Sequence, residues 1–127
     1  MATTSNVIDW MNRDFRFGKK EGTVEIVEHG YDPIRGVDSI KIRIYTDTNR
    51  YSIVAHEGNA DKQSYLGCVA SSRKPRAGED WTRGRDLADG PLTEETWRKI
   101  LADIVSYELV KIHVAGPPSM VTASGNE

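Results

Sequence analysis

Residues 40–57, IKIRIYTDTNRYSIVAHE, carry the clearest strand signal of the sequence. Three isoleucines alternate there with two cations and a tyrosine, in the order Ile40, Lys41, Ile42, Arg43, Ile44 and Tyr45. This alternation puts apolar side chains on one face of a strand, so it predicts a sheet whose other face is wet. Residues 51–57 continue with β-branched and aromatic side chains, which predicts the second strand of a β-hairpin.

Two neighbouring segments also have the composition of strands. Residues 23–29, TVEIVEH, place Val24 and Ile26 on one face, which predicts a half-buried strand before the hairpin. Residues 65–70 form another short apolar run after it. Together these segments predict an antiparallel meander of about four strands, to which the alternating residues 110–114 would add a closing strand.

A long helix is predicted after residue 91. Thr93 is a residue type that caps helices, and Glu94 and Glu95 follow where the helix dipole favours negative charge. Apolar residues then recur at steps of three and four, as on the buried side of an amphipathic helix. They are Trp97, Ile100, Leu101, Ile104, Val105 and Leu109, and Trp97 is expected in the core. A short N-terminal helix is predicted after a cap at Ser5.

Length and composition favour one globular domain. The chain has 127 residues, of which 38% are hydrophobic and 28% charged, as is typical of a folded protein. We therefore predict a single α+β domain over residues 1–115, with an antiparallel sheet of about four to five strands packed by one long C-terminal amphipathic helix. Residues 116–127 are small and polar after a Gly-Pro-Pro start, and we expect a flexible tail.

Charge and cysteine content limit the partners and the cellular compartment that we expect for this protein. A net charge of -2 argues against coating of duplex DNA, because such binding needs many Lys and Arg. The single cysteine cannot form an intramolecular disulfide, and no apolar run reaches the roughly 20 residues of a membrane span. The N-terminal residues lack the pattern of a secretory signal. We expect a cytoplasmic protein that does not bind membranes.

The sequence offers little for catalysis. His29, His56 and His113 fall in separate predicted strands, and a second cysteine to complete a metal site is missing. Cys68 lies in an apolar run, where cysteine usually behaves as a small buried hydrophobe. The sequence contains no phosphate loop, dinucleotide fingerprint or nucleophile elbow. We therefore predict a protein that is not an enzyme and has no catalytic residue, metal or cofactor.

The strongest candidate for a binding site is the segment SSRKPRAGEDWTRGRDLADGP, residues 71–91. A guanidinium can hold phosphate oxygens through two hydrogen bonds, and an indole can stack on a base. A neighbouring carboxylate can accept hydrogen bonds from ribose hydroxyls. The segment therefore predicts a site for a small phosphorylated nucleotide. The predicted ligand-binding residues are Arg73, Lys74, Arg76, Trp81, Arg83, Arg85 and Asp86.

Other interpretations of this segment remain open. Its arginines could pair with Glu79, Asp80, Asp86 and Asp89 in surface salt bridges, each contributing at most about 1 kcal/mol. Arg and Trp are also common anchors of protein interfaces, so a second hypothesis is an inhibitor or adaptor that docks on a host protein. A third is binding of single-stranded nucleic acid, which the acidic total of the chain disfavours.

Residues 65–110 resemble small proteins encoded by phages and prophages, most specifically in RKPRAGEDWTRG, residues 73–84. In size and in its Arg, Trp and Gly loop the chain also resembles phage nucleotide sponges of the first Thoeris anti-defence family, which sequester cyclic nucleotide signals without cleaving them. This resemblance implies a homo-oligomer with ligand pockets at subunit contacts. It also implies capture of a cyclic nucleotide or cyclic ADP-ribose signal against host immune signalling, with a host defence protein as a possible partner.

Overall fold

The computed structural model describes residues 2–15, 23–46, 48–72 and 84–115, and it describes the side chains of all of these except residues 23 and 109–115. The predicted tail, residues 116–127, lies outside this range and stays a prediction. The elements in chain order are α1 (Thr4–Asp14), β1 (Thr23–Asp32), β2 (Val37–Tyr45), β3 (Asn49–His56), β4 (Tyr65–Ser72), β5 (Arg85–Gly90) and α2 (Glu94–Ala115).

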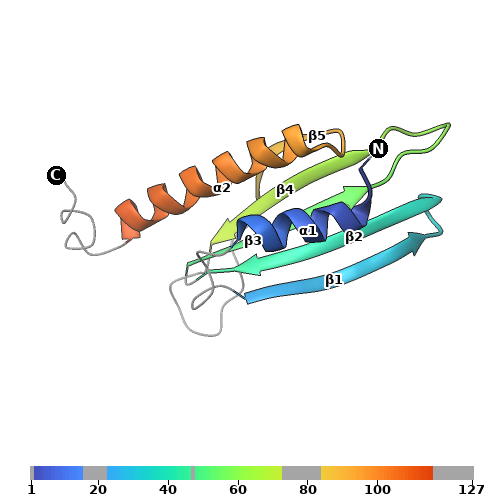
Figure 1. Cartoon of the computed structure of the whole chain (residues 1–127). Coiled ribbons are helices and arrows are strands. Elements are labelled where there is room, and N and C mark those ends of the chain that lie inside the picture. The colour runs from blue at the N-terminus through green and yellow to red at the C-terminus, as the bar shows by residue number, and fades with distance from the viewer. Residues whose placement is uncertain (1, 16–22, 47, 73–83, 116–127) are drawn as a thin grey trace.

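The strands form one antiparallel sheet in the order β1-β2-β3-β4-β5, so each strand pairs with the next along the chain (Figure 1). The α+β class and the predicted meander are therefore confirmed. The alternation that predicted the hairpin is confirmed as well, because Ile40, Ile42 and Ile44 are almost completely buried. Ile42 lies opposite Ile53 of β3, so the two strands bury the same face.

Both helices pack on this buried face of the sheet, α1 on β2 and β3, and α2 on β4 and β5 (Figure 1). Trp97 of α2 is fully buried between them, which confirms the prediction that it belongs to the core. Its ring centroid lies 6.0 Å from that of Trp10 and 5.8 Å from that of Phe15. Aromatic side chains thus join the two helices over the sheet.

Strand β1 is more exposed than the sequence predicted. Val24 and Ile26 are 45% and 47% exposed, although they lie opposite the buried Ile44 and Ile42. The helices pack mainly on β2 to β5, so the edge strand receives little cover. The register also shifts between Ile26 and Glu28, where a bulge interrupts the pairing with β2. The prediction of a half-buried strand is therefore correct for the strand and wrong for its burial.

Two predictions near the C-terminal end of the chain were wrong. Residues 110–114 continue α2 and form no closing strand. The fifth strand is instead β5, which arises inside the segment predicted to be a binding loop. No apolar run marks β5, and it is held by pairing with β4 and by the Ala88 amide, which donates to Asp103 Oδ2 of α2 at 2.9 Å.

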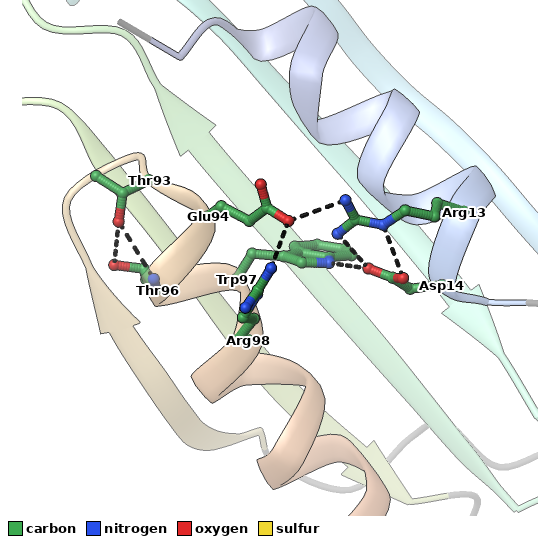
Figure 2. A network of polar contacts seen from close by, with 7 residues as sticks. All are labelled: Arg13, Asp14, Thr93, Glu94, Thr96, Trp97 and Arg98. Atoms are coloured by element: carbon green, nitrogen blue, oxygen red, sulfur yellow. Dashed lines mark hydrogen bonds and ion pairs between the residues drawn. The ribbon is translucent and has the colours of Figure 1, made fainter.

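The helix starts agree with the capping rules. The Thr96 amide donates to Thr93 Oγ1 at 3.2 Å, which confirms the predicted cap of α2 (Figure 2). Arg98 reaches back to Glu94 at 3.1 Å, one turn earlier. For α1 the predicted cap at Ser5 was wrong, because the helix begins at Thr4 and its N-cap residue is Thr3.

A polar contact also joins the two helices. The indole Nε1 of Trp97 donates to Asp14 Oδ2 at 2.7 Å (Figure 2). Arg13 pairs with Asp14 and with Glu94, each at 2.9 Å. The end of α1 is thereby tied to the start of α2 by one carboxylate that serves both a tryptophan and an arginine.

Acid should weaken this junction. The hydrogen bond from Arg13, with a smaller contribution from Trp97, lowers the pKa of Asp14 below its ordinary value of 3.8. A carboxyl whose pKa is lowered on folding stabilises the folded state above its ordinary pKa, and this contribution is lost as the pH falls through the folded value. When the pH is lowered from about 5 to about 2, we expect the free energy of unfolding to fall less for the Asp14→Asn variant than for the wild type. Urea titrations at several pH values would measure this, and parallel curves for the two proteins would contradict it.

Candidate functional site

The face of the sheet opposite the helices carries the polar members of the alternating strands. Since partners in antiparallel strands share a face, the register places Lys41 with Val54 and Arg43 with Ser52 on it. We call this surface the open face. Its residues on β2, β3 and β4 are Ser39, Lys41, Arg43, Tyr45, Arg50, Ser52, Val54, His56, Tyr65, Gly67, Val69 and Ser71.

A hollow of about 340 Å³ lies on the open face. Lys41 and Arg43 of β2 and Arg50 of β3 bring three cationic side chains to it, and Ser52 and Ser71 add hydroxyl groups. We call it the cationic hollow. Its volume falls within the range of roughly 300–1,000 Å³ that small-molecule sites occupy.

Arg43 has unused hydrogen-bonding capacity in this hollow. Its Nε atom is buried and has no hydrogen-bond partner. Within the described part of the chain, neither Arg43 nor Lys41 forms an ion pair. Glu25 lies directly opposite Arg43 on β1, but it accepts a hydrogen bond from the Tyr45 hydroxyl at 3.2 Å. A buried donor without an acceptor costs about 1–3 kcal/mol, and an anion in the hollow could offset this cost.

Two glycines shape the floor of the hollow. A Cβ atom on Gly67 would lie 2.1 Å from the Tyr65 hydroxyl oxygen. Because Gly67 has no side chain, the tyrosine can lie across it and donate to Asp89 Oδ2 at 3.4 Å. A Cβ atom on Gly84 would lie 2.3 Å from Val69 Cγ1. Both positions therefore require glycine for the hollow to keep its shape.

Carboxylates lie on the strands at both sides of the cationic row. Glu25 and Glu28 of β1 are opposite Arg43 and Lys41, while Asp86 and Asp89 of β5 are opposite residues of β4. Among the described residues, the open face is thus positive along its middle and negative toward its edges. A long polyanion crossing the sheet would meet like charge at both edges, whereas a compact anion would meet only the cations.

The sequence-predicted site falls largely outside the described residues. Arg73, Lys74, Arg76, Trp81 and Arg83 are not described, and their part in binding stays a prediction. Both Arg85 and Asp86 are exposed, and they open β5. Because successive strand residues point to opposite faces, these two are not brought together on one surface.

Sequence reasoning missed the cations of the hollow as ligand-binding residues. The alternation placed Lys41 and Arg43 on a wet face, and Arg50 fell in the connection between the predicted strands. The signal that could have found them is the pair of cations at alternating positions of β2, Lys41 and Arg43. These two cations point to a binding surface only when it is known that both described helices pack on the other face of the sheet, and the sequence does not show this.

A second hollow, of about 330 Å³, adjoins the first on the open face. His56 and Tyr65 line it, with Gln63 from the loop between β3 and β4. Tyr65 lines both hollows. We call the second one the polar hollow, because side chains that can donate or accept hydrogen bonds make up most of its wall.

Cys68 also lines the cationic hollow, although it lies opposite Ile53, so its side chain belongs to the buried face and is only 4% exposed. This confirms the prediction that it is buried. Burial raises the pKa of the thiol to about 12, so the nucleophilic thiolate is scarce at neutral pH. Among the described residues no three His, Cys, Asp or Glu side chains are grouped closely enough to hold a metal ion. Neither α1 nor the described part of α2 has the length and apolar character that crossing a membrane requires.

Comparisons of the chain with protein-family models, curated proteins and solved structures gave no match. The resemblance to phage and prophage proteins therefore stays a prediction.

Proposed function

We propose that this protein binds a small phosphorylated ligand in the cationic hollow without catalysing a reaction on it. The observation that carries this proposal is the convergence of Lys41, Arg43 and Arg50 on one hollow, with a buried Arg43 Nε that has no described acceptor. A phosphate group supplies charge and several acceptor oxygens at once, and guanidinium groups hold such oxygens well. The acidic edges favour a compact ligand over a polymer.

The chemistry of the surrounding groups supports binding rather than catalysis. The Cys68 thiol is held in its neutral form by burial, so it is a poor nucleophile. Ser52 and Ser71 stand beside cations, and no histidine is among the described residues lining this hollow. A serine without an adjacent base is weakly nucleophilic. The protein should therefore release the bound molecule chemically unchanged.

The biological setting is proposed from the sequence. It is the cytoplasmic capture of a cyclic nucleotide or cyclic ADP-ribose signal by a homo-oligomer, which would counter host immune signalling. Ser71 and Gly84 line the cationic hollow and flank the segment that holds most of the predicted ligand-binding cations, residues 73–83. The chain thus leaves the sheet for this segment and returns from it beside the proposed site. Native mass spectrometry of protein from cells producing such signals would report stoichiometry and bound mass together.

Replacing Arg43 with Gln should weaken binding of pyrophosphate and of cyclic nucleotides about tenfold or more, because hydrogen bonds to charged groups contribute roughly 1.5–3 kcal/mol. Isothermal titration calorimetry would measure the affinities at fixed salt. Material recovered from the denatured complex should be chemically identical to the added ligand. Recovery of a cleaved ligand would contradict the non-catalytic part of the proposal.

The matched control is Arg98→Gln. It removes the same charge from α2, on the opposite side of the sheet, where the Arg98 side chain is 72% exposed. Its only described ion pair is a surface pair with Glu94, which contributes little. Equal weakening by both variants would show that net charge alone governs binding. Absence of binding by the wild type to any phosphorylated probe would overturn the proposal.

A further inference from the structure

The polar hollow contains a histidine with an unmet hydrogen-bonding need. The Nδ1 atom of His56 is buried and has no hydrogen-bond partner in the described structure. The ring stacks on Tyr65, with centroids 5.9 Å apart and an interplanar angle of 26°. Burial, and then the charge of Arg35, lowers the pKa of His56, so its ring is neutral at neutral pH. A neutral, stacked imidazole suits a polar planar partner better than an anion.

Gln63 and Tyr65 add further uncharged recognition groups to this hollow, which Arg35, Glu57 and Lys62 also line. A side-chain amide both donates and accepts, so it can bind the hydrogen-bonding edge of a heterocycle. Tyr65 is 38% exposed and offers a ring on which another ring can stack. An apolar guest would leave the Nδ1 atom of the histidine without a partner.

The register fixes the distance between the two hollows. His56 lies opposite Ser39 in β2, two positions along the strand from Lys41 and four from Arg43. At about 3.3 Å per residue, the backbone of Lys41 lies roughly 7 Å along the strand from the level of His56, and that of Arg43 roughly 13 Å. A ribose joined to a phosphate bridges the shorter of these separations, and the long side chains of Arg43 and of Arg50, which lies six positions or roughly 20 Å from His56 along β3, would reach back toward the phosphate. The hollows also share Tyr65, so no strand intervenes between them.

We infer that the two hollows form a single nucleotide site, with the base beside His56 and Tyr65 and the phosphate among Lys41, Arg43 and Arg50. This inference rests on the proposed function and names the ligand class for the same site. In this arrangement the two ends of the open face bind different parts of the ligand. The cations supply attraction for phosphate, while the polar hollow selects for a heterocyclic base.

Calorimetry with a matched pair of probes tests the inference. Ribose 5-phosphate carries the sugar and phosphate of a nucleoside 5′-monophosphate without the base. We expect at least one of AMP, GMP, CMP and UMP to bind the wild type about tenfold more tightly than ribose 5-phosphate, as expected for base stacking and edge recognition. Tyr65→Leu should weaken binding of the nucleotide more than binding of ribose 5-phosphate and so remove this preference, although Tyr65 also lines the cationic hollow. Arg43→Gln should weaken both classes of probe.

Two further variants sharpen the test. Gly67→Ala would place a Cβ where the Tyr65 hydroxyl now lies, so it should displace the tyrosine and reduce the preference for nucleotides without changing any charge. Tyr31→Leu is the control, because Tyr31 is 67% exposed and lines neither hollow. The Tyr31→Leu variant should prefer the nucleotide over ribose 5-phosphate as strongly as the wild type does. Equal losses in Tyr31→Leu and Tyr65→Leu would overturn the inference.

The outcomes separate the inference from the proposal on which it rests. If every nucleotide binds no more tightly than ribose 5-phosphate, and that binding still depends on Arg43, the inference fails and the proposed function stands. If neither ribose 5-phosphate nor any nucleotide binds, both fail.

Discussion

Replacing Trp97 with Ala is expected to lower the free energy of unfolding by about 4 kcal/mol, the typical cost of deleting a large buried aromatic side chain. Trp97 is fully buried and contacts both Trp10 and Phe15, so the substitution leaves a cavity where α1, α2 and the sheet meet. It also removes the indole N–H that donates to Asp14. Equilibrium denaturation in urea, followed by circular dichroism, would measure the loss.

Trp97→Phe separates packing from the polar contact. Phenylalanine keeps most of the apolar volume but cannot donate to Asp14, so a loss of about 1–2 kcal/mol is expected. Should Trp97→Ala prove no more destabilising than Trp97→Phe, the role assigned to aromatic packing would be wrong.

Glu108→Ala should have the second-largest effect. The Glu108 Oε1 atom accepts hydrogen bonds from the side chains of Thr46, Asn49 and Tyr51. Asn49 and Tyr51 are fully buried, and burial raises the pKa of the Tyr51 phenol, which therefore stays a donor. Removing the shared acceptor leaves the buried Tyr51 hydroxyl without a described acceptor. Of the described acceptors, Thr46 keeps only the Asn49 carbonyl and Asn49 only the Tyr51 hydroxyl oxygen, so we expect a loss of about 3 kcal/mol. Urea denaturation would again provide the measurement.

Two companions control this experiment. Glu108→Gln keeps an acceptor oxygen and removes the charge, so the loss should be smaller than for Glu108→Ala. Glu95→Ala changes an exposed glutamate of the same helix and should shift stability by no more than about 0.5 kcal/mol. A Glu108→Ala protein as stable as Glu95→Ala would show that the buried cluster contributes nothing.

The parts of the fold that could be predicted are those with local causes. The alternation of Ile40, Ile42 and Ile44, and the cap at Thr93, depend on residues close in sequence, and both were confirmed. β5 has no such signal, because it is defined by its neighbour β4 and by a hydrogen bond from α2. The exposure of Val24 likewise depends on where the helices lie, which the strand's own sequence does not contain.

The candidate site was less predictable than the fold. Sequence reasoning looks for dense clusters of functional side chains, so it selected the segment around Trp81 and Arg83, which lies outside the described residues. The cationic hollow is assembled across strands instead. Arg43 and Arg50 are seven positions apart in sequence, and the hairpin register brings both to one hollow.

The alternation in β2 has a consequence for how this protein can change. The core occupies even positions and the proposed site odd positions of the same strand, so inserting or deleting one residue there would turn the isoleucines toward water or Lys41 and Arg43 toward the core. A point substitution on the core face or on the open face can be tolerated without changing the other face, whereas a register shift of one residue disrupts both the core and the proposed site. Changes in the length of this chain should therefore accumulate in the connections between strands, and ligand preference should evolve by exchange of side chains.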